Sequence, residues 1–157
     1  MPSTFGESKG SQVQILSGPF CFKMKVMFVC KHNRFRSKVA ESIFSHYAKG
    51  RHQVISRGLI KDIGVHSNVK RALKSIGVKL KSDGSRNISV DDFKWADIEV
   101  IVADNVPKSL FLQYDTKIKV WKIRDTHQDD YNGILSRIKN IEKRVKSLIE
   151  KLDKLKN

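Results

Sequence analysis

A chain of 157 residues has the size of one domain and can bury a substantial hydrophobic core. Its 31 Lys and Arg residues against 16 Asp and Glu residues give a net charge of +15, which attracts phosphorylated substrates, nucleic acid or anionic membranes. Two cysteines and five scattered histidines do not suggest a disulfide framework or a metal site. The sequence also lacks a secretory signal, a membrane-spanning run and a nucleotide-binding loop. We therefore expect a cytoplasmic protein without a cofactor.

Residues 1–23 form a first segment with a composition of its own. They are rich in Ser, Gly and Gln and have no hydrophobic periodicity, which is typical of a flexible chain. We therefore expect residues 1–23 to be a disordered N-terminal extension and residues 24–157 to form a single domain. The positive charge is spread along that domain, which also fits a basic solvated surface, and no nucleic-acid-binding motif accompanies it.

The first predicted strand covers residues 25–30 and delivers Cys30 into a short polar loop. A helix is predicted over residues 36–49, because apolar residues recur there at helical spacing, and Gly50 ends it. Downstream, apolar runs of strand length alternate with helical segments. These elements are a strand at 53–56, a helix near 66–76, a polar loop at 79–87, a short helix at 90–95, a strand at 97–103, a helix that begins at Pro107, a strand at 117–123 and a long helix at 130–155.

This alternation of strands and helices predicts an α/β fold with a parallel sheet, because a helix between two parallel strands makes a right-handed crossover. In such sheets ligands bind beyond the carboxyl ends of the strands. Cys30 stands at the end of the first strand. The topology therefore puts this cysteine at the edge of the sheet where a binding site is expected.

The loop after the first strand has the residue types that a thiolate needs to attack an oxyanion. Its backbone N–H groups and the N-terminus of the next helix can bind the anion. Arg36 can hold two oxygens of that anion as a bidentate fork, and Ser37 can donate a hydrogen bond to a Cys30 thiolate. A buried strand cysteine is the alternative, but it leaves Asn33, Arg36 and Ser37 as unexplained polar neighbours.

Cys30-x5-Arg36-Ser37, with Asn33 inside the loop and Val39-Ala40-Glu41 after it, resembles the low-molecular-weight protein tyrosine phosphatases and their relatives, the thioredoxin-type arsenate reductases. The resemblance implies a three-layer, phosphotyrosine phosphatase I-like fold, with a four-stranded parallel sheet in the order 2-1-3-4 and helices on both faces. It also implies that Cys30 and Arg36 are catalytic. The phosphate-binding loop would consist of Lys31, His32, Asn33, Arg34, Phe35, Arg36 and Ser37.

Cleavage of a phosphate ester also needs a proton donor for the leaving oxygen, which the thiolate cannot supply. The family has an aspartate in an Asp-Pro pair just after the last strand. The Trp-x-x-x-Asp segment that ends at Asp125 resembles this pattern, with Thr126 in place of the proline. We therefore assign Asp125 as the general acid of the first step and the base of the second. Asp129 and Asp130 are the alternatives, and Asp125 could instead be a turn residue or a helix cap.

Two loop residues depart from the phosphatase pattern. His32 stands where the phosphatases usually have glycine, and it could either stabilise the thiolate when protonated or be an exposed loop residue. Phe35 replaces the second loop cysteine of many phosphatases, so no protective disulfide can form within the loop. Trp121 and Tyr131 could form an aromatic rim for the substrate, although a tryptophan is more often found in the core.

The choice between the two reactions of the family depends on the number of thiols. Thioredoxin-coupled arsenate reduction needs two thiols besides the nucleophile. No cysteine follows Cys30, and Cys21 precedes the first strand, which separates it from Cys30 by about 17–20 Å. We therefore predict a cysteine-dependent phosphatase with a cysteinyl-phosphate intermediate.

The predicted substrate is a phosphorylated protein, with phosphotyrosine favoured, or a small phosphoester. One alternative is an arsenate reductase that uses an external thiol. Another is a non-catalytic relative that binds phosphate or nucleic acid, and the last is an α/β domain without a site. Nucleic acid is not the favoured partner, and the sequence does not indicate an oligomeric state.

Overall fold

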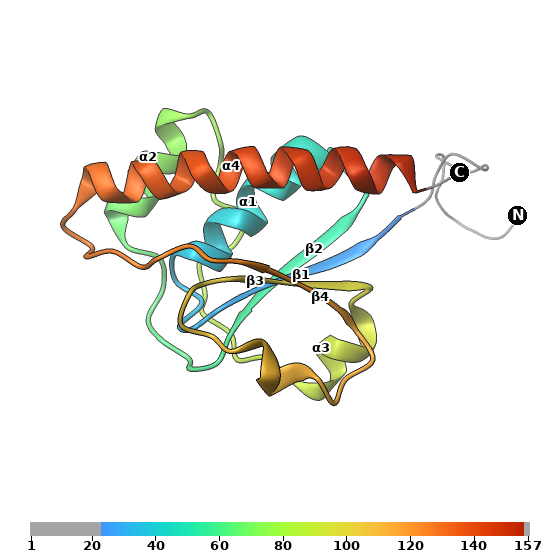
Figure 1. The fold of residues 1–157 in the computed structure, drawn as a ribbon. Coiled ribbons are helices and arrows are strands. Elements are labelled where there is room, and N and C mark those ends of the chain that lie inside the picture. The colour runs from blue at the N-terminus through green and yellow to red at the C-terminus, as the bar shows by residue number, and fades with distance from the viewer. Residues whose placement is uncertain (1–22, 156–157) are drawn as a thin grey trace, which may run out of the picture.

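The computed structural model describes residues 23–155. The extension predicted over residues 1–23 therefore lies, apart from its last residue, outside the described residues. Four parallel strands form one sheet, which Figure 1 shows at the centre of the molecule. From one edge to the other they are β2 (Gln53–Gly58), β1 (Lys25–Cys30), β3 (Ile98–Val102) and β4 (Lys117–Trp121). This order confirms the predicted parallel sheet and its 2-1-3-4 topology.

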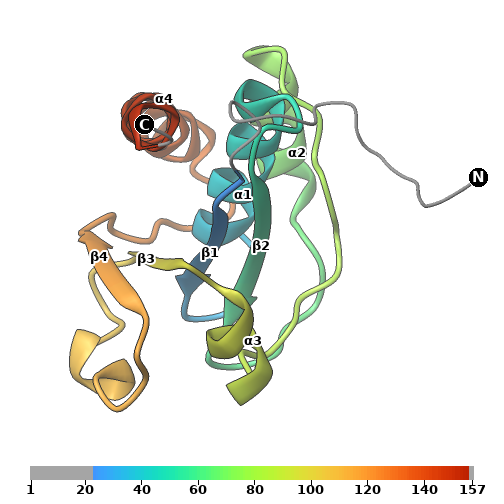
Figure 2. The same ribbon diagram turned by 90° about the vertical axis from the view of Figure 1, so that its right-hand side faces the viewer.

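Helices cover both faces of the sheet and complete three layers (Figures 1 and 2). The helices on one face are α1 (Arg36–Ala48), α2 (Ser67–Ser75) and the long α4 (Tyr131–Lys154), and those on the other are α3 (Val90–Trp95) and the 3-10 helix η1 (Lys108–Phe111). Within residues 23–155, no helix combines the length and the apolar composition needed to cross a membrane.

The central strand β1 is buried on both faces, because helices lie above and below it. Val26 and Phe28 pack into the core on the α1 side, while Met27 and Val29 pack into the core on the α3 side. All four side chains are fully buried, and each such burial stabilises a fold by about 1.5–3 kcal/mol. This packing on two faces fixes the carboxyl end of β1, and with it the position of Cys30.

Some element boundaries differ from the prediction for local reasons. β2 extends beyond residues 53–56, because its pairing with β1 continues to the level of Cys30 and Gly58. Pro107 does not begin a helix: its φ of −69° and ψ of 132° keep it extended just before η1. Asp130 lies just outside α4 as its N-cap, where its carboxylate accepts a hydrogen bond from a backbone N–H of the first turn.

Candidate active site

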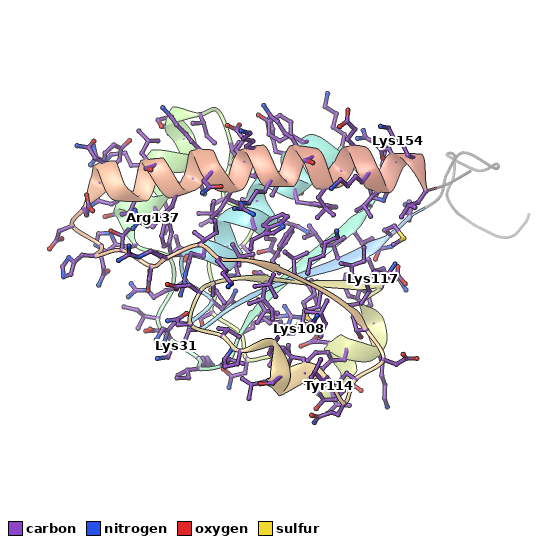
Figure 3. All side chains as sticks on the ribbon, viewed as in Figure 1. Lys31, Lys108, Tyr114, Lys117, Arg137 and Lys154 are labelled. Atoms are coloured by element: carbon purple, nitrogen blue, oxygen red, sulfur yellow. The ribbon has the colours of Figure 1, made fainter. Side chains whose placement is uncertain are left out.

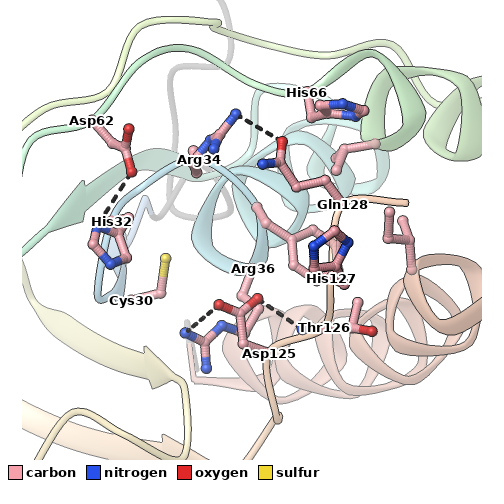
Figure 4. A pocket seen from close by; sticks show the side chains of 13 residues that line it. Cys30, His32, Arg34, Arg36, Asp62, His66, Asp125, Thr126, His127 and Gln128 are labelled. Carbon is pink, nitrogen blue, oxygen red and sulfur yellow. Dashed lines mark hydrogen bonds and ion pairs between the residues drawn. The ribbon is translucent and has the colours of Figure 1, made fainter. Parts of the chain in front are cut away.

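The loop of residues 31–35 joins the end of β1 to the start of α1 and surrounds the Cys30 side chain (Figure 4). Phe35 occupies the N-cap position of α1 but makes no side-chain cap, and the first turn of the helix contains no acidic residue. The N–H groups and the positive end of the helix dipole therefore remain available for an anion beside the sulfur.

The sulfur of Cys30 lies close to two groups of Ser37. The Ser37 hydroxyl oxygen is 3.0 Å from Cys30 Sγ, and the Ser37 backbone N–H donates to the same sulfur at 3.4 Å. The side-chain amide of Asn33 donates to the Ser37 hydroxyl at 2.8 Å. Because the hydroxyl oxygen accepts that hydrogen bond, its own proton can point at the sulfur. The hydroxyl and the backbone N–H of Ser37 can thus both donate hydrogen bonds to this sulfur.

Asn33 braces the loop from within. It is fully buried, and its φ of +51° lies in the left-handed region. Its side-chain nitrogen donates to Ser37 and to Ser56, the latter at 3.0 Å, while its side-chain oxygen accepts from the backbone N–H of Arg86 at 2.9 Å. The flipped amide would set two donors against each other at Arg86, so this network defines the orientation of the side chain.

Beneath the loop, β2 approaches the backbone of residues 31–35 closely. The Ser56 hydroxyl, which accepts from Asn33, donates in turn to the carboxylate of the buried Glu41 at 2.7 Å. Two residues later, a Cβ at Gly58 would lie 2.8 Å from the backbone nitrogen of Asn33 and 2.9 Å from the carbonyl carbon of His32. Only glycine permits this close approach.

Groups from the ends of β3 and β4 hold the Arg36 guanidinium, whose side chain is 2% exposed. Nη1 donates to the backbone oxygen of Ile123 at 2.9 Å and to Asp104 at 3.4 Å, and Nη2 donates to Asn105 at 3.1 Å. The Asp125 carboxylate lies 3.8 Å from Nη2. Sequence reasoning did not connect Asn105 with Arg36, although Asn105 lies in the turn after a strand, at the edge of the sheet where ligands bind.

Cys30, Arg36 and Asp125 line one cavity of about 300 Å³ (Figure 4). Asp125 reaches the cavity from the loop that follows β4, and its side chain is half exposed. The apolar part of the wall comes from Phe35, Val69 and Ile134, and the polar part from His32, Arg34, Asp62, His66, Thr126, His127 and Gln128. The structure thus brings together the three residues that were predicted to be catalytic.

The two alternative acids lie elsewhere. Asp130 is the N-cap of α4, where hydrogen bonds from the Gly133 backbone N–H and the Thr126 hydroxyl hold the pKa of its carboxyl below the ordinary value. Asp129 is largely exposed and lies 3.5 Å from His127. Neither of these carboxylates lines the cavity that contains Cys30. Of the three candidate acids, Asp125 is thus the one that lines the cavity.

A set of hydrogen bonds ties the Asp125 loop to the rest of the site. Arg34 donates to the side-chain oxygen of Gln128 and to the backbone oxygen of Gly64, both at 3.3 Å. Asn68 of α2 donates to the backbone oxygen of Gln128 at 2.9 Å. Gln128 thereby links the loop of residues 31–35, α2 and the Asp125 loop. Figure 4 shows its contact with Arg34. Sequence reasoning missed Gln128, because no local pattern marks a residue whose partners are distant in the chain.

Two further predictions have different outcomes. His32 lines the cavity, is about one-third exposed and has its Nδ1 3.3 Å from the Asp62 carboxylate, so it is not simply a solvated loop residue. The expected aromatic rim is wrong. The Trp121 ring packs against Phe28 in the core at a centroid distance of 5.7 Å, and Tyr131 stacks with a guanidinium of α2 outside the cavity.

Cys30 is the only cysteine among residues 23–155, and it is a free thiol. Cys21, the other cysteine of the chain, lies outside the described residues. Within residues 23–155 there is also no group of three His, Cys, Asp or Glu side chains that could hold a metal ion. Beside the Cys30 thiol, the cavity is lined by the guanidinium groups of Arg34 and Arg36 and the carboxylates of Asp62 and Asp125.

Comparison with known proteins matches residues 25–157 to the family described as low molecular weight phosphotyrosine protein phosphatase. The chain is 26% identical to the glutaredoxin arsenate reductase of Synechocystis over 133 residues, which cover 82% of this chain and 98% of that protein. It is 30% identical to the arsenate reductase of Archaeoglobus fulgidus (TM-score 0.64, 80% of this chain and 98% of that one). It is 25% identical to the low molecular weight protein tyrosine phosphatase of T. tengcongensis, with a TM-score of 0.73. The match covers 82% of this chain and 99% of that one.

Proposed function

We propose that this chain, which belongs to the low molecular weight phosphotyrosine protein phosphatase family, hydrolyses phosphate monoesters through a cysteinyl-phosphate intermediate. The observation that carries this proposal is the meeting of Cys30, Arg36 and Asp125 in one cavity beside the uncapped N-terminus of α1. A nucleophile, an anion-binding group and a proton donor are the three functions that ester cleavage requires.

In the first step the Cys30 thiolate attacks phosphorus, so that a sulfur–phosphorus bond forms and the ester phosphorus–oxygen bond breaks. Asp125 gives its proton to the departing oxygen. Charge builds up on the equatorial oxygens, and the N–H groups of the loop, the N-terminus of α1 and Arg36 stabilise it. The bonds to Asp104, Asn105 and the Ile123 carbonyl hold the guanidinium in place for this role.

In the second step Asp125, now ionised, takes a proton from water, which attacks the phosphocysteine. The sulfur–phosphorus bond breaks, inorganic phosphate leaves and Cys30 returns to the thiolate form. The Ser37 hydroxyl, 3.0 Å from the sulfur, stabilises the thiolate both as nucleophile and as leaving group.

The proposed preferred substrate is phosphotyrosine in a protein. The cavity volume of about 300 Å³ is at the lower end of ligand sites.

Turnover of an aryl phosphate by the wild type and by Cys30→Ser tests this proposal. The serine variant should keep the fold, as judged by circular dichroism, and lose turnover, because a hydroxyl is a far weaker nucleophile at neutral pH. Rapid quenching of the wild type should trap one phosphoryl group per chain on Cys30. Full activity of Cys30→Ser would exclude the covalent mechanism.

A second candidate is reduction of arsenate, which the similarity to two arsenate reductases supports. The Cys30 thiolate would displace hydroxide from arsenate, and an external thiol would attack the cysteine sulfur. That attack gives a mixed disulfide and arsenite, and a second external thiol then releases Cys30. The external thiol would take the place of a second thiol of the chain, because no cysteine follows Cys30. Formation of arsenite with a low-molecular-weight thiol, but no hydrolysis of aryl phosphate, would favour this candidate over the phosphatase.

A further inference from the structure

A cationic groove runs between β4 and α4, and it shares no lining residue with the cavity that contains Cys30. Its volume is about 380 Å³. Four cations line it: Lys119 from β4 and Lys143, Arg144 and Lys151 from α4. We call it the β4–α4 groove. Figure 3 shows this face of the molecule, with Lys117 on β4 and with Arg137 and Lys154 near opposite ends of α4.

The periodicity of each element explains why these cations face one another. On α4, Arg144 and Lys151 are seven residues apart and lie on one side of the helix. On β4, side chains alternate between faces, so Lys117 and Lys119 share the face of Trp121. Trp121 packs in the core beneath α1 and α4. Lys119 therefore projects from the same face as this core residue, toward the side of the sheet on which α4 lies.

None of the acidic residues of α4 lines this groove. Glu142 accepts a hydrogen bond from Tyr47 of α1, and Asp153 binds Arg51 and His52 in the segment after α1. Glu150, the remaining acid of α4, does not line the groove. The helix thus places two of its carboxylates on the α1 side and leaves the side toward β4 cationic.

The groove cations lack compensating charge within the described part of the chain. No ion pair joins Lys119, Lys143, Arg144 or Lys151 to a carboxylate of residues 23–155, and the one recorded partner of the Arg144 guanidinium is the neutral Asn140. Like charges that line one groove repel one another. An anionic ligand in the groove would relieve that repulsion, and it would be attracted by the net charge of +15 as well.

The floor of the groove distinguishes between two classes of polyanion. Proteins that bind single-stranded nucleic acid combine a basic groove with exposed aromatic rings on which bases stack. The aromatic residue of this groove, Trp121, is 8% exposed and packs against Phe28. The groove therefore offers charge without a stacking surface, which favours an acidic polypeptide over a nucleic acid.

We propose that the β4–α4 groove binds an extended, acidic segment of a partner protein. Lys117 and Lys119 are about 6.6 Å apart along β4, and acidic side chains at every second residue of an extended peptide have the same spacing. β4 is also the edge strand of the sheet, so backbone groups on its outer side are available to an added extended chain. This proposal does not depend on the chemistry of Cys30.

Fluorescence anisotropy of a labelled peptide with alternating Glu and Ser residues tests the proposal. The groove variant is Lys119→Glu/Arg144→Glu, and the control is Lys74→Glu/Lys108→Glu, which changes the net charge equally at exposed sites outside the groove. The groove variant should weaken peptide binding about tenfold or more, whereas the control should change it less than about threefold. Equal losses in the two variants would show that only net charge matters and would overturn the assignment.

Two additional measurements make the result specific. A single-stranded oligonucleotide of equal charge should bind more weakly than the peptide. If it binds more tightly, and loses that binding in the groove variant alone, the partner is nucleic acid and the proposed class is wrong. Hydrolysis of a small aryl phosphate should be the same in the groove variant and the wild type, which separates this proposal from that of the catalytic function.

Discussion

The Ser37 hydroxyl lies 3.0 Å from the Cys30 sulfur, and the Asn33 amide that donates to it from the other side leaves its proton free for the sulfur. A hydrogen bond to a charged group contributes about 1.5–3 kcal/mol. Ser37→Ala should therefore lower kcat/KM for an aryl phosphate by roughly 10- to 100-fold. Ser37→Thr keeps the hydroxyl and should retain more activity. Wild-type kinetics in Ser37→Ala would show that the hydroxyl does not act on the sulfur.

The close contact between β2 and the loop of residues 31–35 leads to a second prediction. A methyl group at Gly58 would lie within 2.9 Å of Asn33 and His32, so Gly58→Ala should displace the loop, destabilise the fold by about 1–3 kcal/mol and reduce turnover. Gly84→Ala is the matched control, because a Cβ there meets no atom within 4 Å. Thermal unfolding and turnover of both variants provide the comparison. Equal behaviour of the two would contradict the steric argument.

The sequence predicted the features of the site that are local in the chain. The apolar run before Cys30 and the helical spacing after Arg36 gave the strand, the loop and the helix in their observed places. The position of Asp125 after the last strand also predicted that it lies at the same edge of the sheet as Cys30, and both residues line one cavity. These inferences succeeded because the parallel topology converts positions in sequence into neighbours in space.

Long-range partners could not be predicted in this way. Arg36 is bonded to residues 68, 69 and 87 positions away, and Arg34 to Gln128, 94 positions away. No periodicity within a segment indicates which side chains from other segments will meet. The prediction of an aromatic rim was wrong for a different reason. Trp121 lies on the face of β4 that packs on the core. Whether a side chain on that face is in the core or at a rim depends on the position of the helix that covers the face.

Glu99 of β3 is fully buried, and neither of its carboxylate oxygens has a hydrogen-bond partner among the described residues. Burial raises the pKa of this carboxyl from the ordinary 4.5 to about 7. Between these two values the folded state holds a proton that the unfolded chain releases, so stability should fall as the pH rises from about 4.5 to about 7. Above that range the destabilisation is complete, at about 3 kcal/mol.

Glu99→Gln cannot ionise, and it should remove this part of the pH dependence. Between pH 5 and pH 8, the stability of the variant relative to wild type should rise by about 2.5 kcal/mol. Urea unfolding at both pH values measures this difference. A matched control is Glu150→Gln, at an exposed position of α4. If wild type and Glu99→Gln lose stability in parallel as the pH rises, the buried carboxyl is not ionising in this range.

Asp125→Asn tests the proton donor. The variant should slow hydrolysis of esters with poor leaving groups, such as phosphotyrosine and alkyl phosphates, by about 10²–10⁴-fold, which is the usual contribution of general acid catalysis. It should affect activated aryl esters much less, because their leaving oxygen departs without a proton. Asp125 lines the cavity with Cys30 and lies 3.8 Å from the Arg36 guanidinium, so the position of this carboxylate supports the role.

The two alternative carboxylates provide the controls for this prediction. Asp129→Asn removes a largely exposed charge outside the cavity and should leave the dependence on leaving group unchanged. Asp130→Asn keeps a side-chain oxygen that can accept from the Gly133 backbone N–H, and asparagine is as good an N-cap as aspartate, so this variant should also leave the dependence on leaving group unchanged. An equal loss for good and poor leaving groups in Asp125→Asn would mean that Asp125 acts by position or charge and is not the acid. A leaving-group-dependent loss in Asp129→Asn or Asp130→Asn would instead require the loop to rearrange when substrate binds and bring a later carboxylate to the sulfur.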